Sequence, residues 1–427
     1  MKYSLYDNRE DVIAFGETEM MEGQNQKTAM NSAERALLAL LKKSLFGVGL
    51  ERELSEEEQM EALEESRKQA VFCLAAQSAS LTGDGADRVR GQSLSAIRQN
   101  VEILLQHQYL HELMTKAGIP YVVLKGAASA YYYPQPQQRM MGDVDFLVAQ
   151  EDVERASRLL IEEGFTPWDE AHICHIVFRK EKMHFEMHFE PAGVPDGEEG
   201  RLVRGHCTDM IATAATVQNG FVTFRNPEPF YHGLIMLLHM QHHLLAEGIG
   251  LRHLCDWAVF VDRFSDTEFR AMFENKLKEI GLWVFAVAIS LSAHLGIGLP
   301  YRAFMGREFE LAQSLLLDIL AGGNFGKKDR GRVQEGMFIS NRGKDGVRHG
   351  RIVQMILTVN QIVYTHWPIC KKCRILLPFG WLYWGTVRAC RVALGKRKPM
   401  HLAKAFRESQ PRKELYKRLR LFEKEET

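Results

Sequence analysis

Two aspartates, Asp143 and Asp145, enclose a single valine at the start of the apolar stretch 144–148. Side chains at i and i+2 of a strand point to the same face, so the two carboxylates would lie side by side. Like charges repel there unless a cation lies between them, and carboxylate oxygens suit Mg²⁺ or Mn²⁺. The pair predicts a metal site, although a strand end that dips into solvent would also explain it.

An alternating stretch, MHFEMHF, covers residues 183–189. With a period of two, its polar residues share one face and its apolar residues share the other. The polar face consists of His184, Glu186, His188 and the following Glu190. An edge strand with one wet face would show the same alternation. We interpret Glu186 as a third metal ligand, because a carboxylate on a neighbouring strand would complete the aspartate pair.

A glycine, Gly126, lies upstream of the aspartates and directly after the β-rich run 121–124 and a lysine. A strand–glycine–helix turn lets backbone N–H groups approach a phosphate, and the helix N-terminus adds its dipole. Three acids that hold two metal ions about 4 Å apart are used for in-line phosphoryl transfer. We therefore expect Asp143, Asp145 and Glu186 to be the catalytic and metal-binding residues.

The elements that position these residues follow a change of pattern near residue 118. Helical periodicity dominates before it, and Ser55 with Glu58 forms a capping box. Short β-rich runs then alternate with helices before a second long helical region begins near residue 228. The sequence thus predicts an α+β protein in which a small mixed sheet is embedded in a largely helical chain. The predicted strands are 121–124, 144–148, 175–178 and 183–189, with a helix over 150–163.

The composition is that of an ordinary globular protein, with 46% apolar and 25% charged residues among 427. Lys plus Arg and Asp plus Glu both number 54, so the net charge does not indicate a nucleic-acid partner. The basic tail after Gly385 is either a solvated helix or a surface for nucleic acid or anionic lipid. Seven scattered cysteines favour a reducing cytoplasm. We expect no signal peptide and no integral membrane segment, since the longest apolar run, 375–387, is too short to span a bilayer and is expected to be buried.

The stretch YVVLKGAASAYYYPQPQQRMMGDVDFLV (121–148), followed by a helix ending in Gly-Phe and by FEMHF, resembles the bacterial uncharacterised nucleotidyltransferase family. That family is part of the polymerase-β-like nucleotidyltransferase superfamily. The resemblance covers about residues 95–270 and implies a polymerase-β-like palm, which is the small mixed sheet of the superfamily. It also implies metal-dependent transfer of a nucleoside monophosphate from an NTP. Carried over, Gly126 is the phosphate-loop glycine, the two aspartates are metal ligands, and Glu186 is the third carboxylate.

The phosphate loop departs from the wider superfamily, in which many members have a serine next to the glycine. Here Ala127 follows it, and Ser129 comes too late to be assumed equivalent. Nucleotide binding is then expected from backbone groups of Gly126 and Ala127 and from Lys125. Arg139 suits a triphosphate as a bidentate donor, although a surface arginine in a proline-rich loop explains it equally well.

Polar residues of the later helical region suggest a pocket for the acceptor. His239 and His243 stand at i and i+4, but no HExxH pattern accompanies them. Arg252 and Asp256 have the same spacing and are expected to form a salt bridge or a wall of the pocket. The candidate acceptor residues are His184, His188, His243, Arg252 and Asp256.

These observations divide the chain into five regions. They are an N-terminal helical region (1–117), the nucleotidyltransferase palm (118–200), a helical acceptor-side domain (201–321), a glycine-rich loop or linker (322–350) and a C-terminal helical region with a basic tail (351–427).

The function predicted is that of a Mg²⁺- or Mn²⁺-dependent nucleotidyltransferase that uses an NTP, with ATP expected, and an unknown hydroxyl acceptor. Two alternatives stay open. Ala127 would fit a palm kept as a non-catalytic binding module. A glycosyltransferase could also use the two aspartates, although mostly helices precede them here instead of a nucleotide-binding α/β half.

Overall fold

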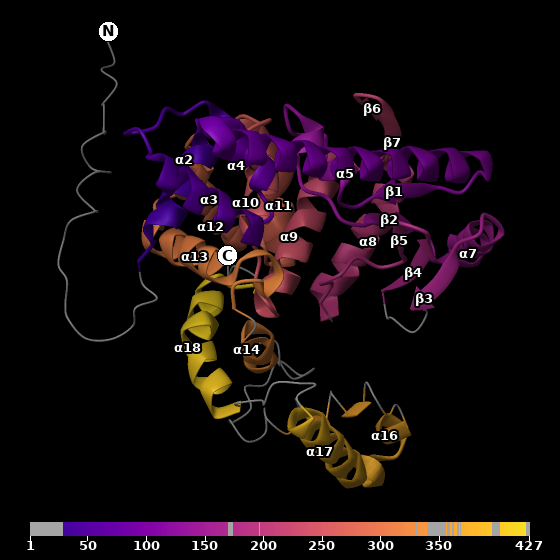
Figure 1. Ribbon diagram of the computed structural model, residues 1–427. Helices are drawn as coiled ribbons and strands as arrows, with labels where there is room; N and C mark the ends of the chain where they lie inside the picture. The colour runs from indigo at the N-terminus through magenta and orange to yellow at the C-terminus, as the bar shows by residue number, and fades with distance from the viewer. Residues whose placement is uncertain are drawn as a thin grey trace.

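The computed structural model describes residues 29–169, 174–195, 197–329, 331–339, 356, 359–360, 363–364, 367, 369–394 and 402–423. A small sheet lies beside a larger group of helices, and the long helix α5 (Gly83–Lys116) runs across both (Figure 1). The other helices of the larger group are α2 Ser32–Phe46, α3 Glu56–Lys68, α4 Phe72–Ser78, α9 Pro229–Leu245, α10 Leu251–Val261, α11 Asp266–Ile280, α12 Trp283–Ile297 and α13 Phe309–Gly322. Single 3₁₀ turns occur at η2 Pro136–Gln138, η3 Gln150–Asp152, η4 Ala303–Met305 and η5 Asn324–Gly326.

Local sequence accounts for several helix starts. The capping box expected at Ser55 and Glu58 is present at the start of α3, and Ser265 with Glu268 forms another at α11. In each box the serine oxygen accepts the N–H of the glutamate three residues later, which satisfies a backbone donor that the first helical turn leaves open.

Five strands form the sheet in the order β1-β2-β5-β4-β3. β2 and β5 run parallel, and the other neighbouring strands run antiparallel. The chain is therefore an α+β protein with a small mixed sheet in a largely helical setting, as the sequence predicts. The strands are β1 Tyr121–Val123, β2 Val144–Val148, β3 Thr166–Asp169, β4 His175–Lys180 and β5 Met183–His188, and α7 (Val153–Glu162) connects β2 to β3.

The two faces of β2 belong to different cores. Phe146 packs with Phe185 of β5 and with Leu110 of α5 in the core of the sheet. Leu147 points the other way and joins the core of the larger helical group. Asp145 shares this second face because side chains alternate along a strand. The site face of the sheet is thus turned toward the helical group, and the apolar back is covered by α5 and α7.

A hairpin interrupts the region 201–321, which the sequence analysis assigned to helices. Its strands are β6 (Ala215–Asn219) and β7 (Val222–Asn226), and they follow α8 (Gly197–Thr213). Val222 and Phe224 are fully buried in the core of the sheet. The sequence predicts helical periodicity only from about residue 228, so the name of a helical domain for 201–321 does not describe this part. The Asn-Gly pair between two short apolar runs is a hairpin signal that the helical reading overlooked.

A helix also lies in 322–350, where the sequence predicts a loop or linker. α14 (Arg332–Ile339) packs against α18 (Leu402–Arg418), and the rest of that range from residue 340 lies outside the described residues. Buried charges join these helices to α13: Arg412 Nη1 donates to Glu335 Oε2 at 3.0 Å, and Arg332 Nη2 donates to Asp318 Oδ1 at 2.8 Å. Ion pairs between residues distant in sequence leave no periodic pattern. The prediction of a loop over 322–350 therefore depended on its many glycines.

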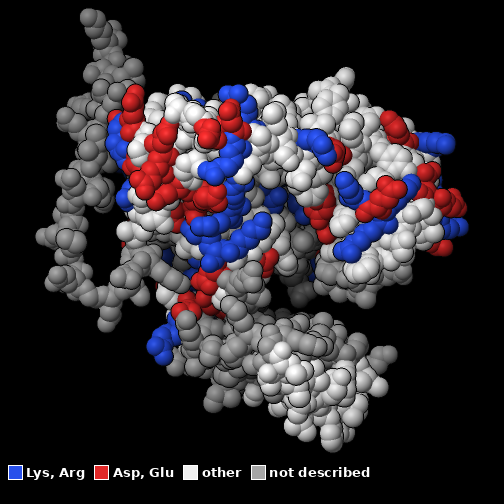
Figure 2. All heavy atoms as spheres, viewed as in Figure 1, with Lys and Arg blue, Asp and Glu red and all other residues white. Residues whose placement is uncertain are grey.

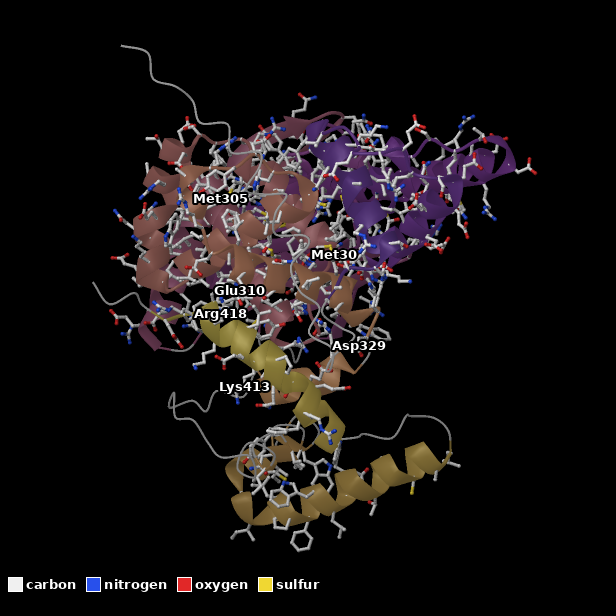
Figure 3. The ribbon with its side chains drawn as sticks, turned by 90° about the vertical axis from the view of Figure 1, so that its left-hand side faces the viewer. Met30, Met305, Glu310, Asp329, Lys413 and Arg418 are labelled. Atoms are coloured by element: carbon white, nitrogen blue, oxygen red, sulfur yellow. The ribbon has the colours of Figure 1, made fainter. Side chains whose placement is uncertain are left out.

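The C-terminal helix continues along α13. Figure 3 shows Arg418 of α18 beside Glu310 of α13, and their charged atoms lie 3.7 Å apart.

The apolar run 375–387, expected to be buried, is largely exposed. It lies in the 3₁₀ turn η6 (Arg374–Leu376) and in α17 (Leu377–Ala393), which follow α16 (Ile369–Lys372). Ile375 is 81% exposed and Leu382 is 68% exposed. The expectation of a buried segment is therefore wrong for these residues.

Replacing Arg412 with alanine should destabilise the contact between α14 and α18 by about 3–5 kcal/mol, because it leaves buried carboxylates without their counter-ion. Arg412 and Glu335 are only 6% and 2% exposed. Hydrogen exchange of the α14 amides measures the change. Lys417→Ala is the matched control, because Lys417 is an exposed cation on the same helix paired with Glu414. Equal protection of α14 in wild type and R412A would contradict the assignment.

Candidate active site

Three acids from two strands converge on one pocket. The parallel register of β2 and β5 sets Asp145 directly beside Glu186, and Asp143 immediately precedes β2. The three carboxylates each offer an oxygen, and these atoms all lie within 4.8 Å of one another. The pocket that they line has a volume of about 280 Å³. Residues 43 and 41 positions apart in sequence are thus brought to one point, as the alternation along the two strands suggests.

A lysine and a histidine lie against the acids. Lys125 Nζ is 2.6 Å from Asp145 Oδ1. His188 Nε2 lies 3.1 Å from the same oxygen and 3.6 Å from Glu186 Oε2. His188 is 3% exposed, so it supports the acids from within the protein and does not line the pocket that they face. His175 of β4 stands opposite His188 in register and makes a second convergent group with it and Glu186.

The pKa values of the three carboxyl groups in this pocket are shifted in different directions. The negative charge of Asp145, together with burial and Glu186, raises the pKa of Asp143 to about 7. Burial alone would raise the pKa of Asp145 as well, but the Lys125 ammonium and His188 hold it well below its usual range. The hydrogen bond from His188 lowers the pKa of Glu186. Three crowded carboxylates with so few counter-charges form a donor set that fits a hard divalent cation such as Mg²⁺ or Mn²⁺.

Gly126 turns the chain from β1 into the short helix α6 (Ala127–Ala130) in a conformation, φ 59° and ψ −111°, that favours glycine. A Cβ at this position would lie 2.8 Å from His107 Nε2. His107 is fully buried on α5, bonds to the Ile103 carbonyl through Nδ1 and accepts the Ala127 N–H at Nε2. The Ala127 N–H, predicted to donate to a phosphate, is thus bonded to the His107 side chain in this structure.

Ser129 lines the pocket on the same side as Lys125 and Gly126. The sequence analysis set this serine aside because it comes two residues later than the expected position. One turn of α6 brings it to the pocket wall, and this helical offset is the signal that could have identified it.

Arg139 is not a surface residue, and its guanidinium does not stand free for a phosphate. It is 5% exposed and donates from Nε and Nη2 to the two oxygens of Asp256, both at 2.7 Å. Tyr133 Oη donates to the same carboxylate at 2.8 Å. The expected Arg252–Asp256 salt bridge is replaced by this pair. Arg252 instead lines the pocket, where burial and the Arg139 charge lower its pKa.

The far wall of the pocket is aromatic. Phe325, in a backbone conformation with φ 54°, lies with its ring centroid 4.6 Å from that of His243 and 5.2 Å from that of His253. The Arg252 guanidinium lies 5.4 Å from the centre of the same ring. His253 is 4% exposed, and its Nε2 has no hydrogen-bond partner in the described part of the chain. Sequence reasoning missed Phe325, because this residue lies in a glycine-rich stretch.

The candidate acceptor residues do not form one group. His243, Arg252 and Asp256 line the pocket with the acids. His184 is exposed and lines a second, more open hollow, which Asp143 shares with the first pocket. The acids thus lie where two depressions of the surface meet. Besides Asp143 and His184, the second hollow is lined by Gln99, Glu102, Ile103, Gln106, Met141, Gly142 and Lys182.

The comparison with known families identifies the fold around this site. A family model described as "Uncharacterised nucleotidyltransferase" matches residues 56–295, which is more than half of the chain. The chain belongs to this family. The match includes the sheet and every pocket residue named above except Phe325, and it supports a general nucleotidyltransferase role. No curated protein matches the chain significantly. Among the described helices, none is both long and apolar enough to cross a bilayer.

His107 makes the stability of this nucleotidyltransferase depend on pH. Burial lowers the pKa of His107 to about 4 in the folded chain, whereas an unfolded histidine titrates near 6.5. The unfolded state therefore binds the proton first, and up to about 3 kcal/mol of stability is lost as the pH falls from 6.5 to 4. His107→Gln should flatten the dependence of the unfolding free energy on pH in this range.

Urea unfolding of wild type and variant across that pH range measures the difference. His242→Gln, at an exposed position of α9, is the matched control and should keep the wild-type slope. A slope unchanged in His107→Gln would show that the imidazole is not held neutral beneath the glycine turn.

Proposed function

We propose that this chain is a metal-dependent nucleotidyltransferase that moves a nucleoside monophosphate from an NTP, with ATP expected, to a hydroxyl of an acceptor. The observation that carries the proposal is the meeting of Asp143, Asp145 and Glu186 within 4.8 Å at the pocket. Mg²⁺ or Mn²⁺ held by these carboxylates would neutralise phosphate charge and lower the pKa of the attacking hydroxyl. Seven free cysteines favour a reducing, cytoplasmic setting.

The pocket offers a triphosphate several donors on one side. Lys125, Gly126 and Ser129 line it next to the acids, and Arg252 lines it from the helical group. We assign phosphate contacts to these four residues. Arg139 instead orients Asp256 and the loop that leads to Asp143, because its donors face the Asp256 carboxylate.

The aromatic wall suits the base of the nucleotide. A π-face stacks well on the ring of Phe325, and the unpartnered Nε2 of His253 is a hydrogen-bonding group for a base or ribose edge. His243, Arg252 and Asp256, expected at first around the acceptor, share this pocket with Lys125 and Ser129 and so favour a place around the NTP. The volume of about 280 Å³ leaves little room for a second substrate there.

The acceptor then approaches through the second hollow, where His184 lies. Asp143 lines both depressions, so an acceptor hydroxyl held in the second hollow lies next to the acids that also face the nucleotide pocket. In-line attack requires that this hydroxyl and the leaving pyrophosphate oxygen lie on opposite sides of the α-phosphorus. His188 positions Asp145 and Glu186 for the step by bonding to both carboxylates.

One observation favours the alternative of a non-catalytic palm. The Lys125 ammonium pairs with Asp145 at 2.6 Å and supplies part of the positive charge that a cation would provide. In an active enzyme this lysine transfers its contact to the triphosphate when the nucleotide and metal bind. In an inactive palm it stays on Asp145. Isothermal titration of ATP with and without Mg²⁺ distinguishes the two, because only the active site should show metal-linked binding.

Asp145→Asn and Glu186→Gln should each lower metal-dependent turnover at least about a hundredfold, because each removes a carboxylate from the metal site. The chain is incubated with cell extract, Mg²⁺ and ATP labelled at the α-phosphate, and transfer of label and release of pyrophosphate are measured. Glu190→Gln is the matched control, since Glu190 follows the same strand but pairs with Arg204 at 2.8 Å. Circular dichroism checks folding, and full activity in both variants would refute the proposal.

Ser129→Ala should raise the KM for ATP about tenfold with little change in kcat, because the hydroxyl contacts a phosphate that is charged in both ground and transition states. The matched control is Ser314→Ala, whose hydroxyl bonds to its own helix at Glu310. Steady-state kinetics with varied ATP measures the split between KM and kcat. An unchanged KM in a folded Ser129→Ala variant would remove this serine from the phosphate site.

A further inference from the structure

A segment outside the matched family region departs strongly from the charge balance of the chain. Residues 346–407 contain twelve Lys or Arg and no Asp or Glu, although the whole chain has equal numbers of acids and bases. The same segment contains three tryptophans at 367, 381 and 384. Such a concentration of positive charge attracts a polyanionic surface within about a Debye length.

The helix in this segment exposes an apolar stripe. Ile375, Phe379, Leu382 and Leu394 are 81%, 63%, 68% and 69% exposed. Phe379 and Leu382 of α17 are three residues apart, and Leu394, directly after the helix, is fifteen residues or about four turns from Phe379, so these three positions fall on one side. Ile375 precedes the helix in η6. Tyr383 is on the same side, and its ring stacks on Trp367. We call Ile375, Phe379, Leu382, Tyr383 and Leu394 the α17 stripe.

The helix that carries most of the α17 stripe lies apart from the main body of the molecule (Figure 1). α16 and α17 lie apart from the sheet and from the large helical group, beyond α14 and α18 (Figures 1 and 3). The described surface of this part is white in Figure 2, whereas the helical group above it carries dense blue and red patches. Exposed aliphatic side chains in a row are costly in water unless a partner covers them.

We propose that the α17 stripe docks onto the surface of a membrane that contains anionic phospholipid. The aliphatic and aromatic side chains would enter the boundary between headgroups and acyl chains, and the positive charge of the sequence 346–407 would attract the anionic headgroups. α17 has 17 residues and none of the described helices can span a bilayer, so the helix lies in the plane of the interface.

Two other occupants fit less well. Single-stranded RNA would use the positive charge, but bases stack on aromatic rings, whereas three of the five stripe residues are aliphatic. A second copy of this chain would bring two segments of twelve positive charges against each other. An anionic lipid surface satisfies both the charge and the aliphatic character. The proposal does not depend on the nucleotidyltransferase activity.

Flotation of the full chain with vesicles tests the proposal. Wild type should bind vesicles of phosphatidylcholine and phosphatidylglycerol and should bind vesicles of phosphatidylcholine alone at least about tenfold more weakly. The triple variant Ile375→Ser, Phe379→Ser and Leu382→Ser keeps every charge and should bind the anionic vesicles at least about tenfold more weakly. The matched control replaces exposed apolar residues elsewhere: Leu94→Ser, Leu105→Ser and Phe221→Ser.

A second variant isolates the charge. Lys396→Gln, Arg397→Gln and Lys398→Gln together should weaken binding to anionic vesicles and leave the weak binding to neutral vesicles unchanged. Fluorescence anisotropy with single-stranded RNA and light scattering for molar mass accompany the flotation. Equal vesicle binding by wild type and the stripe variant would overturn the proposal. RNA binding without vesicle binding, or a dimer that the stripe variant dissolves, would overturn it as well.

Discussion

The parallel pairing of β2 with β5 is the constraint on which the candidate site depends. It sets Asp145 in register with Glu186 and turns both toward the helical group, with Asp143 one step before the strand. Side chains in register on parallel neighbours point the same way, so the acids cannot avoid one another without breaking the sheet. The repulsion that results is visible in the raised pKa of Asp143. The sheet geometry thus imposes an electrostatic cost that bound cations relieve.

Residues around the three acids and the glycine turn stabilise their positions. The Lys125 ammonium and His188 Nε2 both contact Oδ1 of Asp145. His107 holds the glycine turn from below by accepting the Ala127 N–H, and burial keeps its imidazole neutral. Fixed donors and a rigid turn reduce the reorganisation that substrate binding requires. The conformation of the glycine turn therefore depends on its contact with α5 as much as on its own sequence.

The periodic pattern of the sequence predicted the strands that hold the three acids. The residue types near a position in the sequence could not predict which distant residues contact it. The alternation at 183–189 and the aspartates beside 144–148 located the acids, since each depends only on which face a strand residue occupies. The bond of Arg139 to Asp256 could not be predicted, because Asp256 lies 117 residues away and nothing local distinguishes an arginine that binds phosphate from one that binds a carboxylate. The exposed face of α17 was also missed, since an apolar run indicates burial without indicating what covers it.

The Arg139–Asp256 pair joins the loop before β2 to α10, which belongs to the helical group. If the sheet region were separated from the helical group, it would keep Arg139 and lose the carboxylate of Asp256 that pairs with it. The pair thus links the sheet region to the helical group. A substitution of Asp256 in the helical group would therefore require a matching substitution of Arg139. Changes that adapt the pocket to another substrate are thus expected at lining residues that do not contact the Arg139–Asp256 pair, such as Phe325.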